Sequence, residues 1–160
     1  MSQVNRLLFV CAGNICRSPM AEALFRHMAD GHPELEQIEV GSAGTIALNG
    51  NLPCTDSVEV MRSYGLEIAA HRARPLSRRL PADLVLAMDR RTEQDARAMR
   101  LSAQVEMLGD FVGTGEEVVD PYGRSPRRYK AVAEQLHRMI GQVVERLDPE
   151  PATESDESEA

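Results

Sequence analysis

The sequence predicts an α/β fold, a single three-layer domain with a central four-stranded parallel sheet flanked by helices. The chain has 160 residues, the size of one domain, and its 42% hydrophobic and 27% charged content is typical of a globular protein. Short apolar runs alternate with amphipathic stretches along it. This alternation favours a parallel sheet covered by helices on both faces.

Four short apolar segments are the expected strands. The first, residues 6–11, is bounded by a turn that contains Gly13. The others are expected at residues 37–43, 84–88 and 104–108.

Helices are expected between and after these strands, at residues 18–30, 55–64, 90–100 and 127–147. The first has Pro19 in its opening turn, a position that tolerates proline, and it ends before Gly31. Its apolar residues form a plausible packing face: Met20, Ala23, Leu24, Phe25 and Met28. Residues 66–77 and 109–126 are expected to be irregular.

Acidic charge is concentrated at the C-terminal end. From Asp148 onward there are six acidic residues and no Lys or Arg, so −6 of the net charge of −7 falls there and −1 on the rest. Residues 149–160 also contain proline and no large apolar side chain, and they are expected to be a disordered acidic tail after a domain at 1–148. Aromatic residues make up only 4%, which argues against a nucleic-acid partner.

Composition also excludes several other classes of protein. No apolar run approaches the roughly 18 residues of a membrane span, and no signal-peptide pattern is present, so we expect a cytoplasmic protein without a membrane partner. We also expect a monomer. The three cysteines, Cys11, Cys16 and Cys54, are too few for a disulfide scaffold. Without paired Cys or His spacing, a Walker motif or a dinucleotide motif, no metal or cofactor is expected.

Residues 11–18, Cys-Ala-Gly-Asn-Ile-Cys-Arg-Ser, have the properties of an anion-binding loop. A loop that contains Gly13 can curl so that its N–H groups face one centre, to which the following helix adds its positive dipole end. The same groups would stabilise a thiolate at Cys11. The Arg17 guanidinium can hold two phosphate oxygens, and the Ser18 hydroxyl can hydrogen-bond the sulfur.

The Cys-x5-Arg spacing is a weak signal by itself. A buried cysteine at a strand end, followed by a helix-capping serine, would give the same residues. The surroundings make the signal specific, because an apolar strand precedes the loop and Arg-Ser-Pro opens a helix after it.

In this context the chain resembles the low-molecular-weight protein tyrosine phosphatase family, in its bacterial branch. The main motif is Leu-Phe-Val-Cys-Ala-Gly-Asn-Ile-Cys-Arg-Ser-Pro-Met-Ala-Glu-Ala at residues 8–23. Shorter motifs follow in the family's order: Ser42-Ala43-Gly44-Thr45, His71-Arg72, Ala87-Met88-Asp89 and Asp120-Pro121-Tyr122-Gly123. Together they span residues 7–147.

The resemblance implies a role for each motif. Cys11 would be the nucleophile, Arg17 the phosphate clamp and Asp120 the general acid and base. The sequence alone leaves two other roles open for Asp120, a solvated loop residue or a helix cap. The phosphate would be bound by the loop residues Ala12, Gly13, Asn14, Ile15, Cys16, Arg17 and Ser18.

The remaining matched residues would support this site. The resemblance implies that Ser42, His71 and Asp89, together with Asn14, hold the loop in shape, and that Ile15 and Tyr122 wall the substrate pocket. It also implies that Cys16 forms a reversible disulfide with Cys11 under oxidation. Cys54 matches no motif and is expected to be a packing residue.

The function implied is metal-independent hydrolysis of phosphotyrosine in proteins, with inorganic phosphate and other oxyanions as inhibitors. Protein-arginine phosphatase is the alternative, but that preference goes with Thr at the position of Ile15, and an apolar wall suits an aryl ring better than a guanidinium. Arsenate reductase is more remote, since no Cys follows residue 54. A non-enzymatic oxyanion-binding module would lack Cys11, Arg17 or Asp120.

Overall fold

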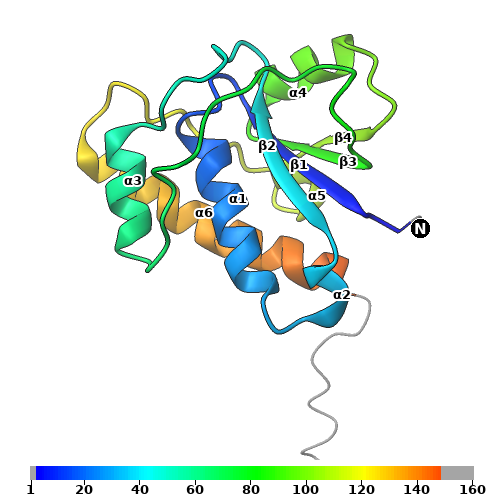
Figure 1. Cartoon of the computed structure of the whole chain (residues 1–160), viewed down its shortest axis with the longest axis horizontal. Coiled ribbons are helices and arrows are strands. Elements are labelled where there is room, and N and C mark those ends of the chain that lie inside the picture. The colour runs from blue at the N-terminus through cyan, green and yellow to red at the C-terminus, as the bar shows by residue number, and fades with distance from the viewer. Residues whose placement is uncertain (1–2, 149–160) are drawn as a thin grey trace, which may run out of the picture.

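Four parallel strands form the central sheet of the computed structural model, which describes residues 3–148. They lie in the order β2 (Glu39–Gly44), β1 (Arg6–Cys11), β3 (Leu84–Ala87) and β4 (Gln104–Met107), and every neighbouring pair is parallel (Figure 1). The predicted strands are confirmed to within two residues at each end. The acidic tail predicted at residues 149–160 lies outside the described residues.

Six helices surround the sheet in the described part of the chain: α1 (Arg17–Ala29), α2 (Pro33–Glu36), α3 (Thr55–Arg62), α4 (Arg90–Ala98), α5 (Leu108–Phe111) and α6 (Pro126–Leu147). The four longer ones were predicted. The short α2 lies where no element was expected, and α5 runs from the end of the expected strand 104–108 into the segment expected to be irregular, because a single turn shows no helical periodicity. None of the six is long and apolar enough to cross a membrane.

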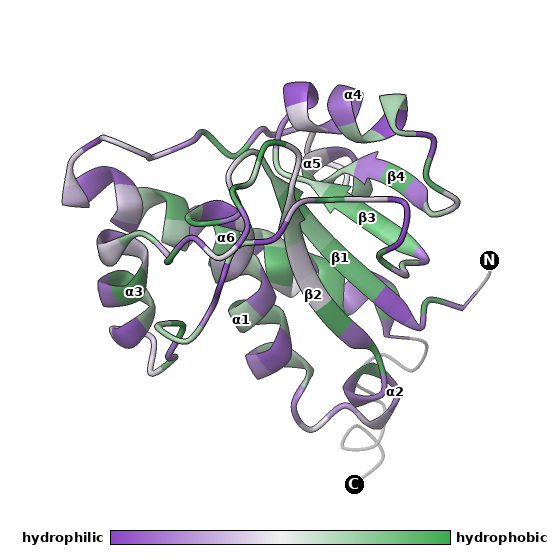
Figure 2. Cartoon of the chain, turned by 45° about the horizontal axis from the view of Figure 1, so that its top comes forward, coloured by the Kyte–Doolittle hydropathy of each residue, from purple (hydrophilic) through white to green (hydrophobic). Residues whose placement is uncertain are grey.

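Apolar clusters on both faces of the sheet make the fold a three-layer domain. Phe9 belongs to one cluster together with Leu24 of α1 and Leu136 of α6. Val10, the next residue of β1, belongs to the opposite cluster with Ala96 of α4. Both faces of β1 are therefore buried, which explains its unbroken apolar run. Figure 2 shows hydrophobic colour along β1 and β3 and mainly hydrophilic colour on α4.

The sheet places one loop at the centre of its carboxyl edge. β1 is an inner strand, so the segment after Cys11 lies between the ends of β2 and β3. That loop is attached to the next segment by N–H bonds from Thr45 to the Cys11 carbonyl (3.0 Å) and from Ile46 to the Ala12 carbonyl (2.9 Å). A Cβ on Gly44 would lie 2.5 Å from the Ala12 oxygen, so this close approach requires glycine.

Candidate active site

Cys11 lies at the end of β1 and is a free, buried thiol. Its Sγ accepts a hydrogen bond from the Asn14 N–H (3.3 Å) and lies 3.0 Å from the Ser18 Oγ. The Ser18 oxygen already accepts a hydrogen bond from Asn14 Nδ2 (2.9 Å), so its proton is available for the sulfur. Two donors directed at one sulfur stabilise the anionic form that a nucleophile needs.

Asn14 holds the loop in its curled shape. Its φ of 57° is left-handed, a conformation that asparagine tolerates better than most side chains. The side chain is fully buried, donates to Ser42 Oγ (3.0 Å) and accepts from the Arg74 N–H (2.9 Å). The Asn14 carbonyl oxygen lies 2.8 Å from His71 Nε2. The structure thus brings Ser42 and His71 to the residue they were expected to support.

Two residues of this network were not predicted. Ser42 Oγ donates to Glu22 Oε1 (2.6 Å), and Arg74 Nε donates to the Ser42 carbonyl (2.9 Å). Glu22 follows Ser18 by four residues in α1, and this spacing could have placed it on the helical face beside the loop. Arg74 gives no such signal, because it lies in an irregular segment.

Arg17 is the largest polar side chain in the interior, with 2% of its side-chain surface exposed. Its Nη1 donates to Asp89 Oδ2 (2.7 Å) and to the Val118 carbonyl (2.8 Å). Within residues 3–148, Nε finds no acceptor. Nε and Nη2 form one edge of the guanidinium, suited to a bidentate contact with an oxyanion. Because buried donors are rarely left unpaired, this edge indicates a ligand site.

Asp89 provides the counter-charge for Arg17. It also caps α4, because its Oδ1 accepts the Thr92 N–H (2.8 Å). Burial raises the pKa of Asp89, but the hydrogen bonds from Thr92 and Arg17 outweigh that effect and place this pKa below its ordinary value. Asp89 therefore remains a carboxylate, and Arg17 keeps a fixed orientation.

A cavity of about 190 Å³ joins the loop to the segment that carries Asp120. It is lined by Cys11, Ala12, Gly13, Ile15, Cys16, Arg17, Ile46, Asp120 and Tyr122. Asp120 Oδ2 lies 3.8 Å from Arg17 Nη2, and Oδ1 accepts the Tyr122 N–H (3.1 Å). The structure brings the predicted Ile15 and Tyr122 together here and adds Ile46, an exposed apolar side chain from a loop assigned no role by the sequence.

The structure corrects the expectation for Cys54. Cys16 forms a disulfide with Cys54, with Cα atoms 5.6 Å apart, and Cys11 is a free thiol, so the expected Cys11–Cys16 disulfide under oxidation stays a prediction. The expectation that Cys54 only packs is therefore wrong. The cause is local: the Cys54 N–H donates to the Ile15 carbonyl (2.9 Å), which holds the start of α3 against the loop within disulfide reach.

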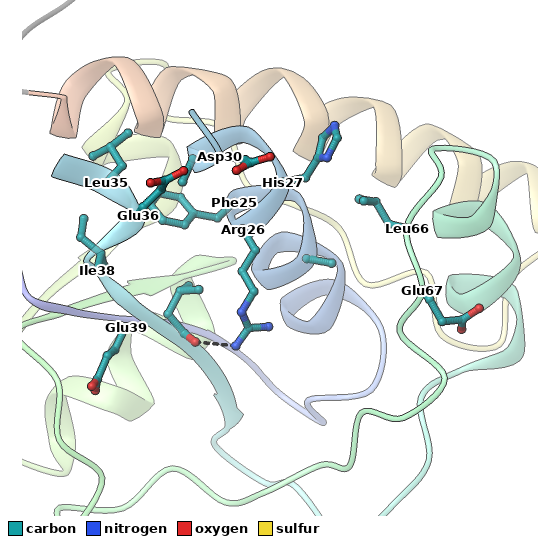
Figure 3. A pocket seen from close by; sticks show the side chains of 13 residues that line it. Phe25, Arg26, His27, Asp30, Leu35, Glu36, Ile38, Glu39, Leu66 and Glu67 are labelled. Atoms are coloured by element: carbon teal, nitrogen blue, oxygen red, sulfur yellow. Dashed lines mark hydrogen bonds between the residues drawn. The ribbon is translucent and has the colours of Figure 1, made fainter. Parts of the chain in front are cut away.

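A larger hollow of about 690 Å³ lies beside the C-terminal half of α1 (Figure 3). Phe25 and Leu35 form part of its apolar lining, and Arg26 donates to the Val40 carbonyl at 2.8 Å. No cysteine lines it. Since the reactive groups gather at the opposite end of α1, the smaller cavity is the candidate active site.

The fold and this site define a class, the small phosphatases with a Cys-x5-Arg loop after the first strand of a parallel sheet. The family model "Low molecular weight phosphotyrosine protein phosphatase" matches residues 6–153. The chain belongs to this family and is an enzyme of it.

Relatives carry two different substrate names. The chain is 35% identical over 148 residues to the probable low molecular weight protein-tyrosine-phosphatase EpsP of Ralstonia nicotianae, covering 90% of this chain and 97% of that one. It is also 35% identical to a protein-arginine-phosphatase of Bacillus subtilis, and the match covers 88% of this chain and 95% of that one. The structure of this chain matches the solved low molecular weight protein tyrosine phosphatase from T. tengcongensis with a TM-score of 0.80 at 38% identity. The match covers 91% of this chain and 100% of that one.

Proposed function

We propose that this chain hydrolyses phosphotyrosine in proteins through a phosphorylated Cys11. The observation that carries the proposal is Arg17 Nε, a buried cationic donor without an acceptor among residues 3–148, on a side chain that lines the same cavity as Cys11. An oxyanion bound there would satisfy the Nε–Nη2 edge and lie next to the sulfur. Inorganic phosphate and other oxyanions are accordingly expected to inhibit.

In the first step the phosphate binds to Arg17 and to the N–H groups of residues 12–18. The Cys11 thiolate attacks phosphorus in line, and the bond between phosphorus and the phenolic oxygen breaks. Asp120 gives its proton to the leaving oxygen. Its place in the wall of the cavity that Cys11 also lines supports this role.

In the second step a water hydrolyses the cysteinyl-phosphate. Asp120, now a carboxylate, takes a proton from the water, whose oxygen attacks phosphorus while the bond to sulfur breaks. The Ser18 hydroxyl, 3.0 Å from Cys11 Sγ, stabilises the departing thiolate. All the charge in this scheme comes from the chain's own groups, so turnover is expected to persist in EDTA.

The side walls favour an aryl substrate. Ile15, Ile46 and Tyr122 line the cavity and offer apolar surface to a ring. A phosphoarginine guanidinium would lose water there without gaining a partner from these side chains. The relatives do not decide the matter, because both substrate names occur at the same identity.

The test measures phosphate release, with EDTA present, from matched phosphotyrosine and phosphoarginine peptides. Cys11→Ser serves as the blank and should lose turnover while still binding phosphate. We expect the wild type to prefer phosphotyrosine, and Ile15→Thr to narrow that preference by about tenfold, the usual size of a change in one pocket contact. A wild-type preference for phosphoarginine would refute the argument from the pocket walls.

The remaining expectations stay proposals. We infer that the substrates are phosphorylated proteins and that the chain acts as a monomer in the cytoplasm. Size-exclusion chromatography with light scattering tests whether the protein is a monomer, and the mass of a dimer would refute this expectation.

A further inference from the structure

We propose that Cys54 completes a three-thiol relay that returns Cys11 to its reduced form after reaction with a hydroperoxide. In this relay Cys16 carries the oxidation away from Cys11, and the Cys16–Cys54 disulfide is its end state. The structure contains this end state, with Cys11 as a free thiol. The proposal rests on the proposed function only in that both need a reactive Cys11 thiolate.

Hydrogen bonds hold Cys54 beside the phosphate-binding loop independently of the disulfide. The Cys54 N–H donates to the Ile15 carbonyl (2.9 Å), and Ser57 Oγ donates to the Cys16 carbonyl (3.5 Å). Both bonds join the start of α3 to the loop that carries Cys16. Reduction would therefore leave the two thiols close together, as repeated disulfide formation requires.

Cys16 has access to both of its proposed partners. It lines the same cavity as Cys11, and it is bonded to Cys54 at the start of α3. Cys11 and Cys16 are 2% and 3% exposed, whereas Cys54 is partly exposed. An external dithiol can therefore approach the relay at Cys54, and it reaches the buried pair of Cys11 and Cys16 more slowly.

The steps balance as follows. The Cys11 thiolate attacks the peroxide, the O–O bond breaks, and protonation of the leaving oxygen gives water and a Cys11 sulfenic acid. The Cys16 thiol attacks Cys11 Sγ, its proton leaves with the hydroxyl as a second water, and the Cys11–Cys16 disulfide forms. The Cys54 thiol loses a proton and attacks Cys16 Sγ, the Cys16–Cys54 bond forms, and Cys11 leaves as the thiolate.

The two possible disulfides have opposite consequences for activity. A Cys11–Cys16 bond removes the nucleophile. With the Cys16–Cys54 bond in place, Cys11 Sγ still accepts the Asn14 N–H at 3.3 Å and lies 3.0 Å from Ser18 Oγ. The chain oxidised in this second way is therefore expected to remain active.

The experiment follows disulfide positions and phosphatase activity together. Each protein is reduced with dithiothreitol, freed of it, treated with one equivalent of hydrogen peroxide and quenched over time with an alkylating agent. Mass spectrometry then maps the disulfides, and parallel samples are assayed for phosphate release. The proteins are the wild type, Cys54→Ser, Cys11→Ser and Thr55→Ala, the last an exposed neighbour that controls for damage to the start of α3.

In the wild type and in Thr55→Ala we expect a transient Cys11–Cys16 disulfide, then Cys16–Cys54, with activity returning before any reductant is added. In Cys54→Ser the Cys11–Cys16 disulfide should persist, with activity lost in proportion until dithiothreitol is added. Recovery in Cys54→Ser at the wild-type rate would overturn the relay, as would formation of Cys16–Cys54 in Cys11→Ser at the wild-type rate. Absent phosphatase activity before peroxide would count against the proposed function alone, because the maps still report the relay.

Discussion

At the scale of single residues, Arg17 has two separate sets of contacts. Nη1 donates to Asp89 and to the Val118 carbonyl, whereas Nε has no acceptor within residues 3–148 and Nη2 lies 3.8 Å from Asp120, a residue that lines the cavity together with Arg17. The cost of burying this cation is offset by the ion pair with Asp89 at 2.7 Å. Loss of Asp89 would therefore affect both stability and the orientation of Arg17.

Asp89→Asn tests this pairing, because asparagine caps helices as well as aspartate does. We expect the free energy of unfolding at pH 7 to fall by about 1–3 kcal/mol, less than for a fully buried pair because 23% of the Asp89 side chain is exposed. We also expect a lower kcat/KM for phosphotyrosine peptide. Urea unfolding and steady-state kinetics measure the two effects.

The stability difference should also depend on pH. The folded-state pKa of Asp89 is lowered, so its stabilisation is fully present above the ordinary aspartate pKa of about 3.9 and is lost as pH falls through the lower folded-state pKa. The gap between the wild type and Asp89→Asn should therefore shrink below about pH 4. A gap of constant size between pH 7 and pH 3 would contradict the role of Asp89 as counter-ion.

Sequence reasoning reached most of these residues through the motifs that it could match. Asn14, Ser42, His71 and Asp89 belong to matched stretches, and the structure places each of them in contact with the loop or with Arg17. Cys54 was missed because it belongs to no motif and lies 38 residues from Cys16. The hydrogen bond from the Cys54 N–H to the Ile15 carbonyl helps to bring the two sulfurs together, and no sequence pattern reveals it.

At the scale of elements, the loop before α6 is anchored to that helix by residues 116 and 117. Glu116 bonds Arg138 of α6 at 2.9 Å through both oxygens, and Gln135 donates to the Glu117 carbonyl at 3.1 Å. The hydrogen bond from Arg138 lowers the pKa of Glu116 to about 2, so this anchor persists at neutral pH. Asp120, shortly after the anchor, has 49% of its side chain exposed.

Arg138→Ala should loosen this loop and impair the proton donor that it carries. We expect a lower kcat for substrates with poor leaving groups, a smaller effect for p-nitrophenyl phosphate, and faster amide hydrogen exchange at residues 116–122. Lys130→Ala, an exposed change on the same helix, is the control. Equal losses for good and poor leaving groups would show that the anchor does not act through Asp120.

A helix or strand could be predicted from the sequence where its residues show apolar periodicity or a capping signal. The strands and the four longer helices have apolar periodicity or caps, and their positions follow from these. The single turns α2 and α5 have neither, and they form where the chain packs: Leu35 and Phe111, one from each turn, are buried in the main apolar cluster. Tertiary packing determines such turns, so the local sequence does not reveal them.

At the scale of the whole molecule, the sheet order brings together residues from opposite ends of the chain. β1 lies between β2 and β3, so the loop after Cys11 meets the segments that follow both neighbours. Parallel sheets bind ligands at this edge, where the strand order reverses. The alternation of strands and helices predicted the parallel sheet, but the 3.8 Å approach of Asp120 to Arg17 depends on how the irregular loop is anchored.

The central claim is that a phosphoryl group passes through the Cys11 sulfur. The most direct measurement is rapid acid quench of Asp120→Ala with p-nitrophenyl phosphate, followed by mass spectrometry of the peptide containing Cys11. Loss of the general base should slow the second step by roughly 10²–10⁴-fold, while a good leaving group needs little help in the first. We therefore predict a phosphoryl group that accumulates on Cys11. Turnover without any phosphorylated Cys11, or turnover that survives in Cys11→Ser, would contradict the account.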